Sequence, residues 1–292
     1  MKRALAIALL LIWGLWAQSL PNRPDSFFFA VIGDSGTGAR PQYEVGKVLA
    51  TFQKSTPFKT VVMLGDNIYG RDSPIDFERK FELPYKALLD QGVKFHAALG
   101  NHDSPRQAAY KPFNMGGKRY YTFKPKSGIR FFALDSTLMD KAQLEWLDKE
   151  LADSGSEWKI VFFHHPLYSS GSRHGSDMGM RSAVEPLLVK YGVALALAGH
   201  DHFYERIKPQ QGVHHFVVGG SAKLRAGNVR RTSLTAKAFD TDRSFLLMEI
   251  DGDTLHYQAV SRRGVTVDSG WFERPRKGHP VSDTGQMGVP QP

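Results

Sequence analysis

Short continuous apolar runs that end in polar clusters recur along the chain. Five of them end at Gly, Asp, Asn or His residues, and they cover residues 26–32, 60–64, 94–99, 158–163 and 193–198. Continuous apolar runs of this length are typical of strands that are covered on both faces. We therefore expect five buried strands, each of which presents polar side chains where it ends.

Amphipathic stretches with helical spacing lie between these runs, at residues 43–52, 76–89, 142–151 and 181–191. Alternating strands and helices predict a layered α/β fold. Further strands are expected at residues 120–123, 129–134, 214–218, 245–250 and 254–260. The last two flank Asp251-Gly252-Asp253, which is a hairpin turn signal. The sequence has no internal repeat and no linker long enough to divide it into two domains.

The polar ends of the five strands carry the candidate chemistry, because ligands of open α/β folds bind beyond the carboxyl ends of strands. The donors at these ends are Asp34, Asp66, Tyr69, Asn101, His102, Asp103, His164, His200 and His202. Oxygen and imidazole donors without sulfur suit zinc, manganese or iron. They outnumber the ligands of one tetrahedral ion, whereas two ions roughly 3.5–4 Å apart that share a carboxylate would use them all.

Composition narrows the function classes. The 292 residues are 41% hydrophobic and 23% charged, which excludes a disordered chain, a collagen-like fibre and a multi-span membrane protein. Cysteine is absent, so disulfides, thiolate metal sites, iron–sulfur clusters and cysteine nucleophiles are excluded. The formal net charge of +9 suits anionic partners. The basic residues are scattered and form no aromatic–basic motif, so phosphorylated small molecules are favoured over nucleic acid.

The first residues resemble an export signal. Lys2-Arg3 precedes an apolar run at 4–16, and Ala17-Gln18-Ser19 offers the small residues of a cleavage site. We predict a signal peptide at 1–19 and an exported protein without stable membrane insertion; an uncleaved anchor or an apolar N-terminal helix is the alternative. Without Lys2 and Arg3 the net charge would be about +7.

One domain is expected at residues 25–273. Pro and Gly are frequent in residues 274–292, for which we predict a flexible tail.

Five motifs in order resemble those of the calcineurin-like metallophosphoesterases. They are Gly33-Asp34-Ser35-Gly36, Gly65-Asp66-Asn67-Ile68-Tyr69, Gly100-Asn101-His102-Asp103, His164 after Val161-Phe162-Phe163, and Gly199-His200-Asp201-His202. Each is weak alone, but all five in order, each after a strand-like run, are a strong signal. Three further features resemble the small, single-domain, tartrate-resistant branch of the purple acid phosphatases: Tyr69, Gln143-Leu144-Glu145-Trp146-Leu147 and Tyr204-Glu205-Arg206.

The resemblance implies a fold and an activity. The fold would be a four-layer α/β/β/α sandwich of two mixed sheets. The activity would be acid phosphatase activity, in which a metal-bound hydroxide at a dinuclear centre hydrolyses phosphate monoesters. The ions would be Fe(III) and a divalent Fe, Zn or Mn. The same site acting on diesters or nucleotides remains an alternative, as does a metal- or anion-binding module without turnover.

The resemblance also assigns roles to residues. Asp34, Tyr69 and His202 would hold the first ion, Asp66 would bridge, and Asn101, His164 and His200 would hold the second. His102 and His174, which lies ten residues after His164, would assist catalysis. Asn101, His102 and His165 would face the substrate. His164 rather than His165 is assigned as the ligand because it lies two residues before Pro166, as in the family.

Neighbouring polar residues receive plainer interpretations. Asp103 and Asp201 are expected to orient loops or imidazole rings, and Asp135 is expected to be structural. The basic residues of the segment that follows Gly219-Gly220 are Lys223, Arg225, Arg230 and Arg231. We expect a solvated loop there, with steering of anionic substrate as the alternative. The sequence leaves the oligomeric state open.

Overall fold

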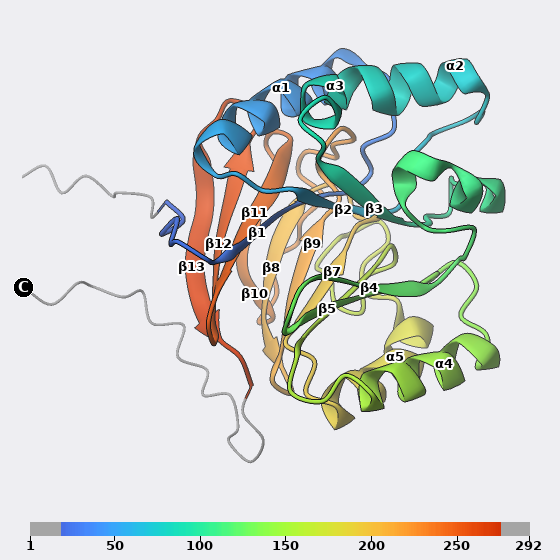
Figure 1. Ribbon diagram of the computed structural model, residues 1–292, viewed down its shortest axis with the longest axis vertical. Helices are drawn as coiled ribbons and strands as arrows, with labels where there is room; N and C mark the ends of the chain where they lie inside the picture. Colours follow the sequence, from blue (N-terminus) through green and yellow to red (C-terminus); the bar gives the residue numbers. More distant parts are fainter. Residues whose placement is uncertain (1–18, 276–292) are drawn as a thin grey trace, which may run out of the picture.

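Two mixed β-sheets pack face to face in the computed structural model, which describes residues 19–275 (Figure 1). The six-stranded sheet has the order β13-β12-β11-β1-β2-β3. Its strands are β1 (Phe27–Ile32), β2 (Thr60–Leu64), β3 (Lys94–Ala98), β11 (Ser244–Asp251), β12 (Thr254–Ser261) and β13 (Thr266–Glu273). Strands β1, β2 and β3 run parallel, and β11 pairs antiparallel to β1.

The second sheet has seven strands in the order β10-β8-β9-β7-β6-β5-β4. They are β4 (Tyr121–Lys126), β5 (Ile129–Ala133), β6 (Trp158–Phe163), β7 (Leu195–Ala198), β8 (Tyr204–Gln210), β9 (Val213–Val218) and β10 (Thr235–Phe239). Strands β5, β6, β7 and β9 form a parallel centre. The carboxyl ends of β6 and β7 therefore lie at one edge of this sheet.

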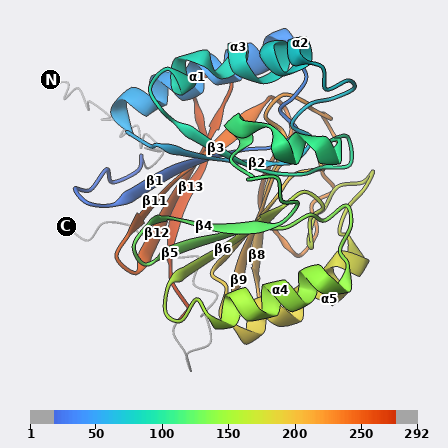
Figure 2. The ribbon, with the colours of Figure 1, turned by 45° about the vertical axis from the view of Figure 1, so that its right-hand side comes forward.

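Helices cover the outer face of each sheet (Figure 2). They are α1 (Arg40–Ser55), α2 (Pro74–Phe77), α3 (Leu83–Leu89), α4 (Lys141–Ala152) and α5 (Met178–Lys190). The first three lie over the six-stranded sheet, and α4 and α5 lie over the seven-stranded sheet. The predicted four-layer α/β/β/α sandwich is confirmed.

Strand β6 shows how the apolar pattern produces these layers. Its six side chains are all buried, and five of them are apolar; the exception, Lys159, donates from its Nζ to the carbonyl oxygen of Gly155. Ile160 and Phe162 pack into the core between the two sheets, whereas Val161 and Phe163 pack into the core beneath the helices. Successive side chains of a strand point to opposite faces, so a strand between two apolar layers favours apolar residues on both of its faces.

Local signals set the helix starts. The Asp140 side chain accepts a hydrogen bond from Gln143 N at the start of α4, and the Asp177 side chain accepts one from Met180 N at the start of α5. A side-chain oxygen at this position satisfies one of the free N–H groups of the first helical turn. Helix α1 has no such side-chain cap and carries Pro41 in its first turn instead.

The structure differs from the sequence prediction in several elements. The single helix expected at 76–89 is divided into α2, a π-helical turn at Glu78–Glu82 and α3. Pro84, which has no N–H for a helical hydrogen bond, lies at the start of α3. Short 3-10 turns at Pro105–Ala109 and Lys111–Phe113 were not predicted. Strands β8, β10 and β13 were also missed, because charged and polar residues interrupt their apolar pattern.

The predicted signal peptide lies outside the described residues except for Ser19, and so does the predicted tail beyond Pro275. Within the described part of the chain, no helix has the length and apolar character needed to cross a membrane.

The environment of the His96 side chain allows a prediction of how the free energy of unfolding depends on pH. Its ring stacks on Phe123 across the two sheets, with centroids 3.7 Å apart. Its Nδ1 has no hydrogen-bond partner among residues 19–275. Burial, followed by the nearby Lys94, lowers the pKa of His96 from 6.5 to about 4. The unfolded chain therefore binds a proton more readily than the folded chain, and stability is lost as the pH falls from about 6.5 towards 4.

We expect His96→Phe, which keeps a ring on Phe123, to reduce this acid sensitivity. The loss of unfolding free energy between pH 7.5 and pH 4.5, measured by urea titration, should be smaller in the variant by about 2 kcal/mol. Equal losses in both proteins would show that the proton does not bind here.

Candidate metal centre

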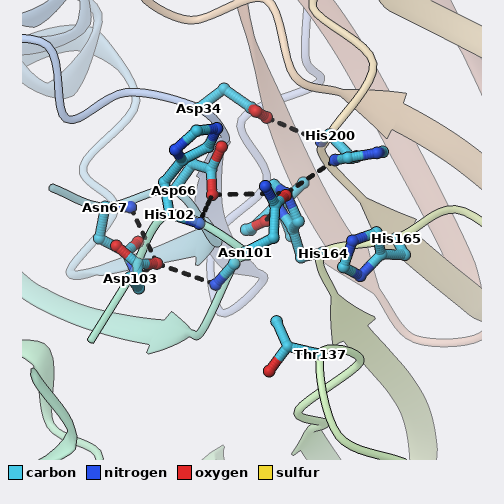
Figure 3. A network of polar contacts seen from close by, with 12 residues as sticks. Asp34, Asp66, Asn67, Asn101, His102, Asp103, Thr137, His164, His165 and His200 are labelled. Carbon is cyan, nitrogen blue, oxygen red and sulfur yellow. Dashed lines mark hydrogen bonds and ion pairs between the residues drawn. The ribbon is translucent and has the colours of Figure 1, made fainter. Parts of the chain in front are cut away.

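Five strand ends from both sheets meet at one place (Figure 3). Asp34, Asp66 and Asn101 follow β1, β2 and β3 of the first sheet. His164 and His200 follow β6 and β7 of the second sheet. The site therefore lies where the carboxyl ends of the parallel strands of both sheets converge, as the sequence analysis expected.

The backbone at these ends adopts unusual conformations. Asp34 and Asp66 have φ angles of 52°, and His200 has a φ angle of 69°. Residues other than glycine rarely adopt this left-handed region, and each instance costs of the order of 1–3 kcal/mol. The Asp34 carboxylate accepts a hydrogen bond from the backbone N–H of His200 at 2.8 Å, which helps to hold both residues in place.

Two glycines permit the close approach of the loops after β2 and β3. A Cβ atom on Gly100 would lie 2.3 Å from the backbone nitrogen of Asp66. Gly65 has a φ angle of +85°, and a Cβ atom there would lie 2.7 Å from His164 Nδ1. Side chains at these two positions would push the donor residues apart.

One group of donors surrounds Asp34, and we call it the first donor group. Ligand atoms of Asp34, Asp66 and His202 all lie within 4.8 Å of one another. The Tyr69 hydroxyl lies 3.1 Å from Asp34 Oδ1 and 3.4 Å from His202 Nε2. Four side chains from three loops thus direct oxygen or nitrogen atoms at one small volume.

The second donor group surrounds His164. Its Nε2 lies 2.9 Å from Asn101 Oδ1, 3.1 Å from His200 Nδ1 and 3.5 Å from Asp66 Oδ1. Asp66 therefore belongs to both groups. His165 also lies close to His164 and His200. Its Nδ1 is hydrogen-bonded to Ser136 Oγ at 2.9 Å.

The ring orientation of His164 is fixed by the other sheet. His164 Nδ1 lies 2.8 Å from the carbonyl oxygen of Leu64, so Nδ1 carries the proton and donates it to that carbonyl. The lone pair of Nε2 then faces the donors of the second group. Metal-binding imidazoles characteristically use one nitrogen in this way while the other binds a metal ion.

The two buried carboxylates of the site are in an environment that favours the binding of cations. Asp34 and Asp66 are 0% and 1% exposed. Among the described residues, only histidines lie within ion-pair distance of them. Burial, followed by the charge of Asp66, raises the pKa of Asp34 well above its usual value. Two buried carboxylates this close are mutually destabilising unless positive charge is added.

The imidazoles and the phenol support the same conclusion. Burial is the main cause that lowers the pKa of His164 and of His202 to about 3, and that of His200 to about 2. Neutral imidazoles keep the lone pairs that bind metal ions. Burial and then Asp34 raise the pKa of Tyr69, so a phenolate here requires a nearby cation. The donor set therefore fits a pair of metal ions.

His102 lies at the mouth of the centre. Its backbone N–H donates to Asp66 Oδ1 at 3.0 Å, and its exposed ring lies 4.8 Å from the Tyr69 ring, centroid to centroid. A groove of about 980 Å³ opens beside it, between the segment that follows Tyr69 and the 3-10 turn at Pro105–Ala109. The imidazole is thus accessible to a molecule in this groove.

His174 reaches the other side of the mouth. Its exposed ring lies 4.3 Å from the His200 ring, centroid to centroid. The loop that carries it is held by the buried Asp201, whose Oδ2 accepts hydrogen bonds from Ser169 Oγ at 2.5 Å and Gly175 N at 3.1 Å. Asp201 therefore orients the His174 loop.

Asp103 and Asp135 lie near the site but are not members of either donor group. Asp103 accepts hydrogen bonds from the backbone N–H groups of Gly100, Asn67 and Ile68, so it ties the loops after β2 and β3 together. Asp135 bonds to Thr137 and forms an ion pair with Arg119, outside both donor groups.

The solvated-loop prediction is wrong for two of its four basic residues. Lys223 Nζ lies 4.4 Å from the centroid of the Tyr69 ring. Arg225 is half-buried and donates its backbone N–H to the carbonyl oxygen of His202 at 3.1 Å. Arg230 and Arg231 are exposed, as expected. The signal that could have found the first two is Gly219-Gly220, which follows β9 as another strand end with glycine.

Residues 29–204, more than half of the chain, match the calcineurin-like phosphoesterase family. The chain belongs to this family. Its metallophosphoesterase fold is shared by solved structures. A purple acid phosphatase from yellow lupin seeds superposes with a TM-score of 0.71 at 21% identity, covering 87% of this chain and 55% of that one. A dimetal phosphatase from Danio rerio superposes with a TM-score of 0.66 at 17% identity, covering 85% and 99%.

Several relatives of this phosphoesterase are named acid phosphatases. Tartrate-resistant acid phosphatase type 5 of Oryctolagus cuniculus is 28% identical over 195 residues, which cover 54% of this chain and 60% of the relative. Purple acid phosphatase 4 of Arabidopsis thaliana is 25% identical over 294 residues, which cover 84% and 86%. The chain thus shares the fold and the ordered motifs of a phosphoesterase family, and this family implies a dinuclear metal centre.

We expect Asp201→Ala to loosen the loop that carries His174. Amide hydrogen exchange of residues 169–176 should become faster by about tenfold, since two hydrogen bonds to a buried carboxylate are lost. Asp201→Asn keeps one acceptor oxygen and should show a smaller effect. Unchanged exchange in the alanine variant would show that other contacts hold this loop.

Proposed function

We propose that this phosphoesterase is an exported acid phosphatase that hydrolyses phosphate monoesters of small molecules with two bound metal ions. The observation that carries the proposal is the position of Asp66, whose carboxylate belongs to both donor groups. A shared carboxylate is the feature by which two cations are held at the separation used in two-metal hydrolysis. The signal-like N-terminus supports export.

Each donor group has its own metal preference. Asp34, Tyr69 and His202 would hold one ion together with Asp66. The two carboxylates and the phenolate oxygen suit hard Fe(III). Asn101, His164 and His200 would complete the other site, where neutral imidazole and amide donors suit divalent Fe, Zn or Mn. Two ions held in this way act as Lewis acids towards the ester and the attacking water.

Residues of the chain bind and orient the phosphate group. Asn101 is exposed at the mouth, and its amide nitrogen is a hydrogen-bond donor to phosphate oxygens. His102 lies between the centre and the groove, where its imidazole can give a proton to the oxygen of the leaving alcohol. His165 and His174 flank His200 on the other side, where they can contact the remaining phosphate oxygens.

Charge and shape favour monoesters over diesters. A monoester carries two negative charges and a diester carries one, and Lys223 and Arg225 add positive charge beside the centre. The groove beside His102 offers room for one organic group, and Arg71, Phe77 and Tyr110 line it. A second organic group would have to lie against the cationic side.

The proposal is tested with one phosphate monoester, one phosphate diester and one variant of the protein. The metal-loaded protein should hydrolyse p-nitrophenyl phosphate with a higher kcat/KM than bis(p-nitrophenyl) phosphate at acidic pH, and it should contain two metal ions per chain by elemental analysis. Asp66→Ala should lose bound metal and lower kcat/KM by at least about a thousandfold, because both ions lose a ligand.

Asp148→Asn is the matched control, because Asp148 lies on α4, where it bonds to Lys190 and Tyr191 of the outer layer. It should leave metal content and turnover unchanged. Full turnover by Asp66→Ala would refute the assignment, and a preference for the diester would move the activity to phosphodiester hydrolysis.

The identity of the first ion predicts a colour. Coordination of Fe(III) by the Tyr69 phenolate should give the purified, iron-loaded protein a broad visible absorption band. Tyr69→Phe removes the oxygen and should abolish the band while keeping the ring that packs beside His102. A band that survives in the variant would exclude Tyr69 as the iron ligand.

A further inference from the structure

The ammonium group of Lys80 lies against the segment that follows β2 and carries Tyr69. Lys80 Nζ donates hydrogen bonds to the carbonyl oxygens of Tyr69 at 2.7 Å and Arg71 at 3.2 Å. It also forms an ion pair with Asp76 Oδ1 at 2.6 Å. An ammonium group has three N–H donors, so these three acceptors use its full capacity. The Lys80 side chain is only 16% exposed, which is low for a lysine.

Gly70 separates the two carbonyl groups that face this ammonium. It has a φ angle of +80°, which lies in the left-handed region that favours glycine. A Cβ atom on Gly70 would lie 4.0 Å from Lys80 Nζ. The turn at Gly70 and the ammonium group together fix the backbone on the carboxyl side of Tyr69.

The amino side of Tyr69 is held by the loop after β1. The backbone N–H of Tyr69 donates to the carbonyl oxygen of Gly36 at 2.9 Å. A Cβ atom on Gly36 would lie 1.8 Å from the carbonyl oxygen of Asn67, so the two loops can approach this closely only with glycine there. Tyr69 is therefore held on both sides, by Gly36 at its N–H and by Lys80 at its carbonyl. These two bonds set the direction in which the phenol leaves the backbone.

Lys80 projects from the π-helical turn at Glu78–Glu82. The backbone N–H of Leu83 donates there to the carbonyl oxygen of Glu78, five residues earlier. Such turns occur mostly as single turns within α-helices, and they are frequent at functional sites. The longer hydrogen-bonded ring changes the direction of the side chains relative to a regular α-helix. Here the turn belongs to the segment that presents Lys80 to the loop after β2.

Helix α1 anchors this turn from the side. Helices α1 and α3 lie side by side over the six-stranded sheet (Figure 1). Pro84 has no N–H to donate to the carbonyl of Lys80, four residues earlier, and Gln42 Nε2 donates to that carbonyl at 2.5 Å instead. Gln42 is fully buried, and its Oε1 accepts from the backbone N–H of Gly38 at 2.7 Å. The position of Lys80 is thus tied to the loop after β1.

We propose that Lys80 is a positioning residue of the metal centre, which holds the backbone of Tyr69 and thereby keeps the phenol oxygen within the first donor group. This inference rests on the proposed role of Tyr69 as an iron ligand, but Lys80 itself lies outside both donor groups. Hydrogen bonds from a charged donor are roughly twice as strong as those between neutral groups. Without the ammonium, the segment after β2 is therefore free to move away from Asp34.

The test removes the ammonium and measures how iron is bound. Lys80→Met keeps a long unbranched side chain and removes the charge and all three donors. In this variant the visible band of the iron-loaded protein should shift and weaken. Iron affinity should fall by about 10-fold to 100-fold, the effect of removing a group that orients a metal ligand. Lys80→Arg keeps a charged donor and should restore part of both, and a change in stability alone would not shift the band.

Lys86→Met is the matched control, because Lys86 forms an ion pair with Asp90 at i,i+4 as Lys80 does with Asp76. It should leave the band and the iron affinity unchanged. An unchanged band and affinity in Lys80→Met would overturn the proposal, and so would equal changes in the control. Thermal unfolding midpoints check that the variants fold, and Lys80→Gln takes the place of Lys80→Met if the latter does not.

Hydrogen exchange separates this inference from the proposed function. Amide exchange of residues 68–72 in the full chain, with and without added iron, needs no turnover. It should become faster by about tenfold in Lys80→Met, because two carbonyl groups lose a charged donor. If the wild-type protein loaded with iron has no visible band, the ligand role of Tyr69 fails. The exchange rates then still decide whether Lys80 holds this segment, and unchanged rates would overturn the inference.

Discussion

The mutual repulsion of two buried carboxylates is the constraint on which the site depends. Asp34 and Asp66 are fully buried, and in the described structure no lysine or arginine pairs with them. Such a pair is unfavourable in the protein alone, as the raised pKa of Asp34 shows. It becomes favourable when cations bind, because the same charges then attract metal ions in a region of low dielectric constant. The free energy lost in placing the carboxylates here is thus recovered as metal affinity.

The two sheets hold this unfavourable arrangement together. Asp34 of the first sheet accepts from the backbone of His200 in the second, and His164 of the second sheet donates to the carbonyl of Leu64 in the first. These bonds cross the sandwich at the point where the donors meet. Left-handed conformations at Asp34, Asp66 and His200 persist because the strands on either side are buried and cannot relax.

The sequence predicted the parts of this structure that depend on local pattern. Continuous apolar runs such as β6 identify central strands, and the motif residues that follow them indicate where the donors gather. Polar strands were missed, since β8 carries Glu205 and Arg206, whose partners are distant in the sequence. The position of Arg225 at the site depends on a backbone bond to His202, which no periodicity encodes. The same holds for the loop contact between Asp201 and Gly175.

The long separation of the paired segments in the sequence has a consequence for biogenesis. Asp34 and the His200 backbone, 166 residues apart, bond directly, and β1 pairs with β11 near the end of the domain. During synthesis on the ribosome, the two aspartates therefore emerge long before the histidines that complete the set of proposed metal ligands. Contacts between segments so distant in the sequence form slowly during folding. Metallation must be a late event that follows global folding, so the metal supply of the compartment where folding ends determines which ions are captured.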